Sequence, residues 1–262
     1  MTASRVDRLD DPRLADYRDL RDPDALAQRG LFAAEGQLVV RQLLASRFRT
    51  RSILATEPAL DALRPLFSDA VAVYVASRDV VEGVIGYAFH QGCLAFGERG
   101  PEMALPAAPA LVIALDQVSN PDNVGGIFRN AFAFGAGGVL LSAGCADPLY
   151  RKAIRVSLGA TLVVPFARAD DWPARLDAFR AAGHTIIALT PSAGAIPLDA
   201  FAWPAEPVVV VGAEGPGLCA ASRAAADVAV RITMASGVDS LNASTATGIA
   251  LHAWAATRSG RR

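Results

Sequence analysis

The residues with the clearest potential for chemistry lie in three stretches, of which the most conspicuous is residues 208–218, VVVVGAEGPGL. Four valines run into a turn that contains Glu214 and three glycines, Gly212, Gly215 and Gly217. A dinucleotide-binding turn has the spacing G-x-G-x-x-G after the first strand of its unit. Here the spacing is G-x-x-G-x-G, and the turn comes too late in the chain for a complete dinucleotide domain. The pattern therefore favours another small molecule, bound at the carboxyl end of a strand. Glycines that only permit a sharp turn are the alternative.

The second stretch, residues 119–135, is SNPDNVGGIFRNAFAFG and has the spacing of an amphipathic helix. Asn123 can cap this helix after a turn at Pro121 and Asp122. The spacing predicts a buried stripe that consists of Val124, Ile127, Phe128, Ala131 and Phe134. Arg129 lies off that stripe, so its guanidinium either reaches a ligand at the end of the sheet or is simply solvated.

The third stretch, residues 232–254, is ITMASGVDSLNASTATGIALHAW. It predicts a strand end, a loop of small polar residues, and a helix. Asn242 and Ser244 are either helix caps or parts of a site, and both interpretations fit the sequence. Small residues along the helix allow another backbone to approach closely.

The elements that must position these stretches follow from the rhythm of the chain. From Leu111 onward, short apolar runs such as residues 111–116 and 161–166 alternate with helical patterns. This alternation predicts an α/β fold with a parallel sheet covered on both faces. The first third predicts a smaller α/β unit, with helices at 32–46, 56–67 and 77–86 and strands at 51–56, 71–77 and 93–99. Prolines near residues 104–110 mark a linker, so the predicted domains are 1–103 and 111–262.

Composition narrows the class of protein. The chain has 262 residues, 52% of them hydrophobic, which is enough for a large core. No leader-like apolar segment and no bilayer-length apolar run is present, so we expect a soluble cytoplasmic protein without a membrane partner. The three cysteines and three histidines are scattered, which predicts neither a disulfide framework nor a metal site. The net charge of −1 lacks the excess of basic residues typical of nucleic-acid binders, although arginines cluster locally.

Taken in order, the three stretches resemble the three motifs of the SpoU/TrmH family of RNA 2′-O-ribose methyltransferases, in the SPOUT superfamily. The resemblance covers the chain from about Leu111. It implies a SPOUT domain tied in a trefoil knot, an exception to the usual unknotted topology. The first domain more faintly resembles the SpoU substrate-binding domain, which is L30e/L7Ae-like, as in ribosomal-protein RNA binders.

The resemblance also implies roles for individual residues. S-adenosylmethionine would be held mainly by backbone groups at Leu189, Thr190, Gly212, Gly217, Ile232, Met234 and Leu241. Arg129 would lie beside the methyl acceptor. The residues lining or bracing that site would be Asn123, Glu214, Asn242 and Ser244. For Glu214 we favour a structural role, in which it accepts hydrogen bonds from loop amides, over direct contact with Arg129 or substrate.

The expected reaction is therefore transfer of a methyl group from S-adenosylmethionine to a ribose 2′-hydroxyl, in ribosomal RNA of the 23S type rather than transfer RNA. A tRNA methyltransferase and a non-catalytic RNA-binding protein of the same fold are the alternatives. The resemblance implies a homodimer, with the last helix in its interface. The basic residues we expect to contact RNA phosphates are Arg47, Arg49, Arg51, Arg151, Lys152 and Arg155.

Overall fold

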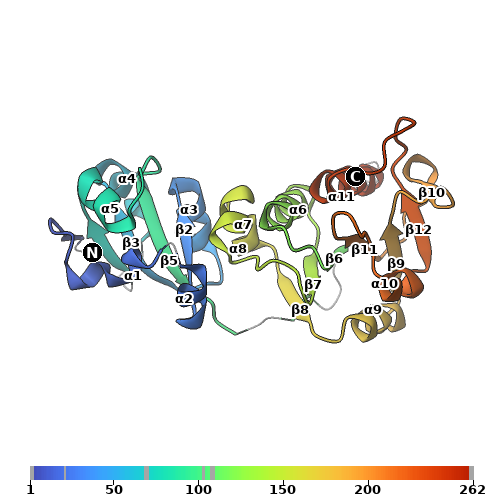
Figure 1. Cartoon of the computed structure of the whole chain (residues 1–262), viewed down its shortest axis with the longest axis horizontal. Coiled ribbons are helices and arrows are strands. Elements are labelled where there is room, and N and C mark those ends of the chain that lie inside the picture. The colour runs from blue at the N-terminus through green and yellow to red at the C-terminus, as the bar shows by residue number, and fades with distance from the viewer. Residues whose placement is uncertain (1–2, 21, 68–70, 102–103, 107–109, 260–262) are drawn as a thin grey trace. The chain divides into compact units, whose positions relative to one another are not determined.

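The chain folds into two compact units, whose elements are labelled in Figure 1. The structure is a computed structural model that describes residues 3–20, 22–67, 71–101, 104–106 and 110–259. The first unit comprises Met1–Pro101 with Leu149–Val163, and the second comprises Glu102–Pro148 with Val164–Arg262. Leu149–Val163 lies in the predicted second domain but groups with the first unit. The predicted limits 1–103, 104–110 and 111–262 remain a prediction.

The first unit is built on a mixed sheet of five strands. Their order is β1 (Ser4–Arg5), β4 (Ala72–Val75), β3 (Thr50–Ala55), β5 (Cys93–Glu98) and β2 (Leu31–Glu35). β1, β4 and β3 are parallel, whereas β5 is antiparallel to both β3 and β2.

Seven α-helices and two short 3-10 helices complete this unit within the described residues. They are η1 (Pro12–Leu14), α1 (Ala15–Arg18), α2 (Pro23–Gln28), α3 (Gln37–Ala45), α4 (Glu57–Leu63), η2 (Arg64–Leu66), α5 (Arg78–Ile85), α7 (Arg151–Val156) and α8 (Ala160–Val163). As the sequence predicts, α5 starts after Ser77, whose side chain accepts from the Val80 amide, and ends at Gly86 in the left-handed conformation. The core includes Tyr17 and Phe96, whose ring centroids are 4.8 Å apart.

The prediction of one helix over residues 32–46 is wrong for its first part. Leu31–Glu35 forms strand β2, and helix α3 starts only at Gln37. Gly36, with φ of 96°, separates the two elements. The first four residues of β2 are buried, and pairing with β5 outweighs the helix propensity of the two alanines.

The second unit is built on a seven-stranded sheet in which every pairing is parallel, as predicted. The strand order is β10 (Ile196–Pro197), β12 (Val228–Arg231), β9 (Thr185–Leu189), β11 (Pro207–Gly212), β6 (Val112–Asp116), β7 (Gly138–Ser142) and β8 (Phe166–Ala169). β6 and β7 are buried along their whole length, which explains their continuous apolar sequences.

Helices cover both faces of this sheet. Figure 1 shows α6 (Pro121–Phe134) beside α11 (Ala243–Ser259) on one face, and α9 (Trp172–Ala181) with α10 (Ala220–Ala225) on the other. A 3-10 helix, η3 (Leu198–Ala200), precedes β11. Trp172 of α9 donates its indole N–H to Ser222 of α10 at 2.7 Å, which ties these two helices together. No helix in the described part of the chain is long and apolar enough to cross a membrane.

The strand predicted over residues 161–166 is also wrong. Ala160–Val163 forms the short helix α8, and strand β8 starts at Phe166. The Ser157 hydroxyl accepts from the Thr161 amide at 3.4 Å, which supports a helical turn, and Pro165 cannot continue the helix. Local hydrogen bonding therefore overrides the β propensity of this apolar run.

Candidate functional site

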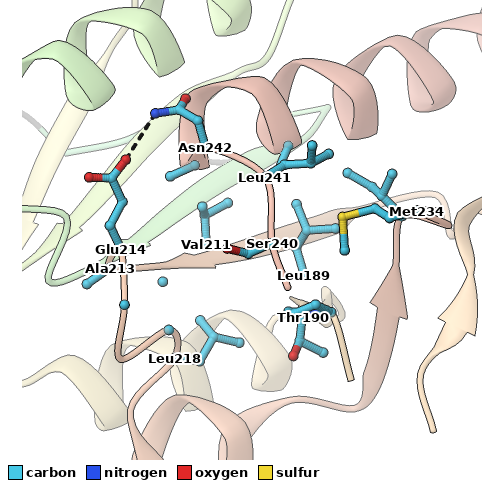
Figure 2. Close-up of a pocket in the computed structure, with 17 residues that line it drawn as sticks. Leu189, Thr190, Val211, Ala213, Glu214, Leu218, Met234, Ser240, Leu241 and Asn242 are labelled. Atoms are coloured by element: carbon cyan, nitrogen blue, oxygen red, sulfur yellow. Dashed lines mark hydrogen bonds between the residues drawn. The ribbon is translucent and has the colours of Figure 1, made fainter. Parts of the chain in front are cut away.

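A pocket of about 470 Å³ lies at the carboxyl edge of the parallel sheet, within the second unit. It is formed where β9, β11 and β12 end, together with the loop that leads into α11 (Figure 2). All seven residues predicted to hold a cofactor line it, namely Leu189, Thr190, Gly212, Gly217, Ile232, Met234 and Leu241. The fold therefore gathers four separate segments, drawn from residues 189–246, around one cavity.

The glycine turn forms one wall of this pocket. Gly215 and Gly217 have φ values of 81° and 70°, so both need the left-handed conformation that favours glycine. Gly212 is needed for a different reason, because a Cβ there would lie 2.3 Å from the carbonyl carbon of Gly217. The Gly217 amide donates to the Ala213 carbonyl at 3.0 Å and closes the turn. The glycines thus permit the tight turn, and the same loop lines the pocket.

Asn242 connects the three motifs. Its Nδ2 donates to Oδ1 of Asn123 at 2.7 Å and to Oε1 of Glu214 at 3.0 Å. Figure 2 shows its amide facing the Glu214 carboxylate at the rim of the pocket. Its Oδ1 accepts from the amides of Ser244 and Thr245, so Asn242 also caps α11. Asn242 therefore caps α11 and also belongs to the hydrogen-bonded group that includes Asn123 and Glu214.

Glu214 is exposed and accepts the side chain of Asn242. Within the described residues, no loop amide donates to its carboxylate, which differs from the form of structural role expected from the sequence. The contact links the glycine turn to the start of α11 instead.

Asn123 is not the cap of α6, contrary to the interpretation of the sequence. That cap is Asn120, whose Oδ1 accepts from the Asp122 amide at 2.9 Å, with Pro121 as the first helical residue. Asn123 lies in the first turn of the helix, is 3% exposed, and faces Asn242. Its Nδ2 is buried and has no hydrogen-bond partner among the described residues.

Helices α6 and α11 pack closely along the same side of the site. A Cβ at Gly126 would lie 2.2 Å from the hydroxyl oxygen of Ser244, and Asn130 donates to the Ser244 carbonyl at 2.8 Å. Of the predicted apolar stripe, all members are buried except Phe134, which is half-buried. Arg129 is exposed, has no partner among the described residues, and does not line the pocket.

The basic residues predicted to contact RNA all belong to the first unit, and they differ in environment. Arg49 pairs with Glu98 at 3.3 Å, Arg51 pairs with Asp16 at 3.1 Å, and the Arg47 guanidinium lies 4.2 Å from the Phe48 ring centroid.

On α7, Arg151 donates to the Tyr87 hydroxyl at 3.0 Å and lies 3.9 Å from Glu35. Burial, more than the nearby Glu35 charge, raises the pKa of Tyr87 to about 12, so its hydroxyl stays protonated at neutral pH. Lys152 is half-buried, whereas Arg155 is exposed and without a partner among the described residues. Arg151 therefore helps to dock α7, and Arg155 is available to an external anion.

Some residues at the site were missed by the sequence analysis. Ala213, Leu218 and Ser240 also line the pocket, and their signal was only that they neighbour motif residues. Asp116 was missed at the end of β6, although an acid that ends an apolar run is a visible signal. Among the described residues, no group of three or more His, Cys, Asp or Glu side chains is placed to hold a metal ion.

A parallel sheet with a pocket at its carboxyl edge is typical of α/β proteins that bind a ligand at this edge. Residues 110–252 match the model of the SpoU rRNA Methylase family. The chain is 43% identical to an uncharacterised tRNA/rRNA methyltransferase of Mycobacterium bovis, over 96% of this chain and 90% of that protein. The chain therefore belongs to the SpoU rRNA methylase family.

Solved structures agree with this assignment. An AdoMet-bound rRNA methyltransferase from Sinorhizobium meliloti has a TM-score of 0.84 and 26% identity, covering 98% of both chains. An RNA 2′-O ribose methyltransferase has a TM-score of 0.80 and 25% identity, covering 97% of this chain and 99% of the other.

Proposed function

We propose that this protein transfers a methyl group from S-adenosylmethionine to a ribose 2′-hydroxyl in RNA, with ribosomal RNA favoured over transfer RNA. The observation that carries the proposal is the pocket of about 470 Å³ around which all seven predicted cofactor residues lie. Family membership and the similarity to a 2′-O ribose methyltransferase support the same reaction. The rRNA methyltransferase from Sinorhizobium meliloti supports the choice of RNA.

The chemistry of the pocket suits an adenosyl sulfonium ligand. Leucine, isoleucine and methionine side chains offer apolar walls, and the glycine turn leaves backbone groups accessible. Glu214 is the one charged side chain among the described lining residues. A pyrophosphate would find no basic partner among them, whereas a cationic sulfonium is compatible with a carboxylate. The lining residues and the glycine spacing therefore both argue against a dinucleotide ligand.

The proposed mechanism relies on positioning. When bound, S-adenosylmethionine would supply an electrophilic methyl group, and its transfer to a hydroxyl would release S-adenosylhomocysteine and one proton to solvent. The transfer needs the two reactants held in line. Asn242 holds Glu214 against the start of α11, which keeps the glycine turn and the helix in one geometry. A guanidinium group donates hydrogen bonds and has no acceptor, so we assign Arg129 to the phosphate beside the acceptor and to orientation of the hydroxyl, not to proton removal.

The decisive test is methyl transfer to RNA by the full chain. The protein is incubated with labelled S-adenosylmethionine and with separate ribosomal and transfer RNA fractions. We expect label in ribosomal RNA, and one linkage that resists alkali, because a 2′-O-methyl group removes the attacking hydroxyl. Label in an alkali-labile position contradicts ribose methylation, and RNA binding without any label favours the non-catalytic alternative.

The exposed Arg155 provides a test of RNA contact by the first unit. We expect Arg155→Ala to weaken RNA binding and to reduce the slope of log affinity against log salt by about one, as for one lost phosphate contact. Arg8→Ala is the matched control, because Arg8 has a side chain that is 79% exposed but already pairs with Asp10. The measurement is filter binding or fluorescence anisotropy across a salt series. An unchanged slope in Arg155→Ala would remove this residue from the RNA contacts.

We further propose that the protein is a homodimer through α6 and α11. A groove of about 450 Å³ runs along these helices and is lined by Asn130, Phe134, Ser244, Thr245, Gly248, Ile249 and His252. The small residues of the groove allow another backbone to approach closely, and the apolar Ile249 side chain is 39% exposed. Both features favour packing against a second copy of this chain.

The groove can be tested by placing a charge in it. We expect Ile249→Asp to raise the dimer dissociation constant at least about a hundredfold, because an unpaired charge would be buried. Light scattering gives the mass of each sample. Leu66→Asp, at a residue 44% exposed in the first unit, should leave the dimer intact. A monomeric wild-type protein would contradict the proposal directly.

Two finer features of the fold complete the proposal. We infer that the segment with β12 and α11 is threaded as a trefoil knot, and that the first unit is an L30e/L7Ae-like RNA-binding domain. The hydrogen bond from Asn242 to Asn123, 119 residues apart, supports close association of the three motifs. Protease fragments that stay associated after cleavage near the loop would be consistent with threading.

A further inference from the structure

Asp116 is a buried acid that the proposed mechanism does not use. It is the last residue of β6 and is 1% exposed. Its register partner on the neighbouring strand β11 is Gly212, the first glycine of the turn that lines the pocket. Asp116 therefore lies beside the point where that turn leaves the sheet.

The carboxylate of Asp116 holds the other end of the same turn. Its Oδ2 accepts from the Cys219 amide at 2.7 Å, although the two residues are 103 positions apart. Cys219 directly follows Leu218, which lines the pocket, and is the N-cap of α10. On the outer side, the Arg223 side chain donates to the Leu218 carbonyl. The exit of the turn is thus held by two hydrogen bonds, one to the buried Asp116 carboxylate and one from the exposed Arg223 side chain.

The turn has little freedom between these two ends. Backbone pairing of Ala213 with Gly217 closes it, and a Cβ at Gly212 would lie 2.4 Å from the Leu218 nitrogen. A displacement of Cys219 would therefore be passed to Gly217 and Leu218, two residues that line the pocket.

Burial of the Asp116 carboxylate has an energetic cost, which indicates a role beyond stabilising the fold. The second oxygen, Oδ1, is buried and has no hydrogen-bond partner among the described residues. Burying a carboxylate with one oxygen unsatisfied is unfavourable, and a smaller apolar residue would avoid that penalty. A charge-assisted hydrogen bond is, however, the stronger means of fixing an amide at a defined position.

We propose that Asp116 is a positioning residue for the cofactor pocket, which acts by fixing the Cys219 amide and so the path of the glycine turn. The inference rests on the proposed use of S-adenosylmethionine. It does not depend on the RNA acceptor, because its test measures cofactor binding without RNA.

The experiment compares the full-length wild type with Asp116→Ala and Asp116→Asn by isothermal titration with S-adenosylmethionine. Asp116→Ala removes the acceptor, and we expect the cofactor dissociation constant to rise about tenfold or more. Asp116→Asn keeps a carbonyl oxygen for the Cys219 amide, and its dissociation constant should stay within about threefold of the wild-type value. In turnover, the larger change in Asp116→Ala should fall in the cofactor KM rather than in kcat.

Asp227 provides the matched control. Its Oδ2 also accepts a backbone amide, that of Ile186 at 2.8 Å, but at the start of β9, the end of the strand away from the pocket. Asp227→Ala should lower the melting temperature and leave cofactor affinity unchanged. If Asp116→Ala does not fold, Asp116→Ser replaces it, since a serine hydroxyl is too short to reach the Cys219 amide.

Three outcomes would overturn the inference. They are wild-type affinity in Asp116→Ala or its serine replacement, equal losses in the alanine and asparagine variants, and an equal loss in Asp227→Ala. Failure of the proposed function looks different, because the wild type would then bind S-adenosylmethionine but methylate no RNA, or bind no cofactor at all.

Discussion

Arg129→Ala is expected to reduce methyl transfer to RNA at least about a hundredfold while the cofactor dissociation constant stays within about twofold of the wild-type value. The different effects on methyl transfer and on cofactor affinity follow from the position of Arg129. Arg129 projects from α6 into solvent, does not line the pocket, and has no partner among the described residues. Its loss should therefore leave the fold and the cofactor site intact and remove only the contact with the RNA phosphate.

Arg129→Lys should be nearly as inactive as the alanine variant. Both side chains carry a positive charge, but lysine lacks the planar fork of donors that orients a phosphate by two hydrogen bonds. Transfer of labelled methyl groups at saturating cofactor separates the variants, and titration with S-adenosylmethionine gives the affinity.

The matched control is Arg175→Ala. Arg175 is also exposed and without a partner among the described residues, but it lies on α9, which covers the opposite face of the sheet in Figure 1. Its loss should leave turnover unchanged. Full activity in Arg129→Ala would refute the role given to this guanidinium, and equal losses in both variants would indicate a general effect of removing positive charge.

Gly212→Ala is the second substitution for which we expect a large effect. The added Cβ would lie 2.3 Å from the carbonyl carbon of Gly217 and 2.4 Å from the Leu218 nitrogen. These are backbone atoms, so no side-chain rotation can relieve the contact and the turn itself must move. We expect the cofactor dissociation constant to rise about a hundredfold and the free energy of unfolding to fall by about 1–3 kcal/mol.

Gly194→Ala controls for the loss of a glycine as such. Its added Cβ would meet no atom within 4 Å, and Gly194 has no left-handed φ. This variant should bind cofactor like the wild type and should be as stable or slightly more stable. Thermal unfolding and isothermal titration of both variants check the prediction. Unchanged affinity in Gly212→Ala would mean that the turn can shift without disturbing the pocket.

Much of the fold of the second unit is predictable from local patterns. Runs such as residues 207–211 are buried on both faces, and such runs between helices are typical of parallel strands. The sequence predictions are wrong where a local pattern fits both a helix and a strand. Residues 32–35 have helical spacing but pair with β5, and residues 161–163 are β-branched or apolar but form a helical turn.

The site was predictable in its residue types more than in its contacts. The seven residues expected to hold the cofactor all line one pocket, whereas Asn123, Arg129 and Ser244 do not line it. The sequence predicts Asn123 as the cap of α6, whereas the structure shows Asn120, because both asparagines precede an apolar stripe and only their hydrogen bonds distinguish them. The acid at the end of β6 is visible in the sequence, but the contact of Asp116 is not, because its partner, Cys219, is 103 residues away.

The sequence by itself therefore determines the alternation of strands and helices, the family resemblance and the chemical character of the site. Only the tertiary structure decides that Asn242 bridges Asn123 and Glu214, that Asp116 fixes Cys219, and that Leu149–Val163 groups with the first unit. The physical reason is range. Periodicity and capping depend on residues a few positions apart, whereas these contacts depend on strand order and register, which bring together segments that share no local signal.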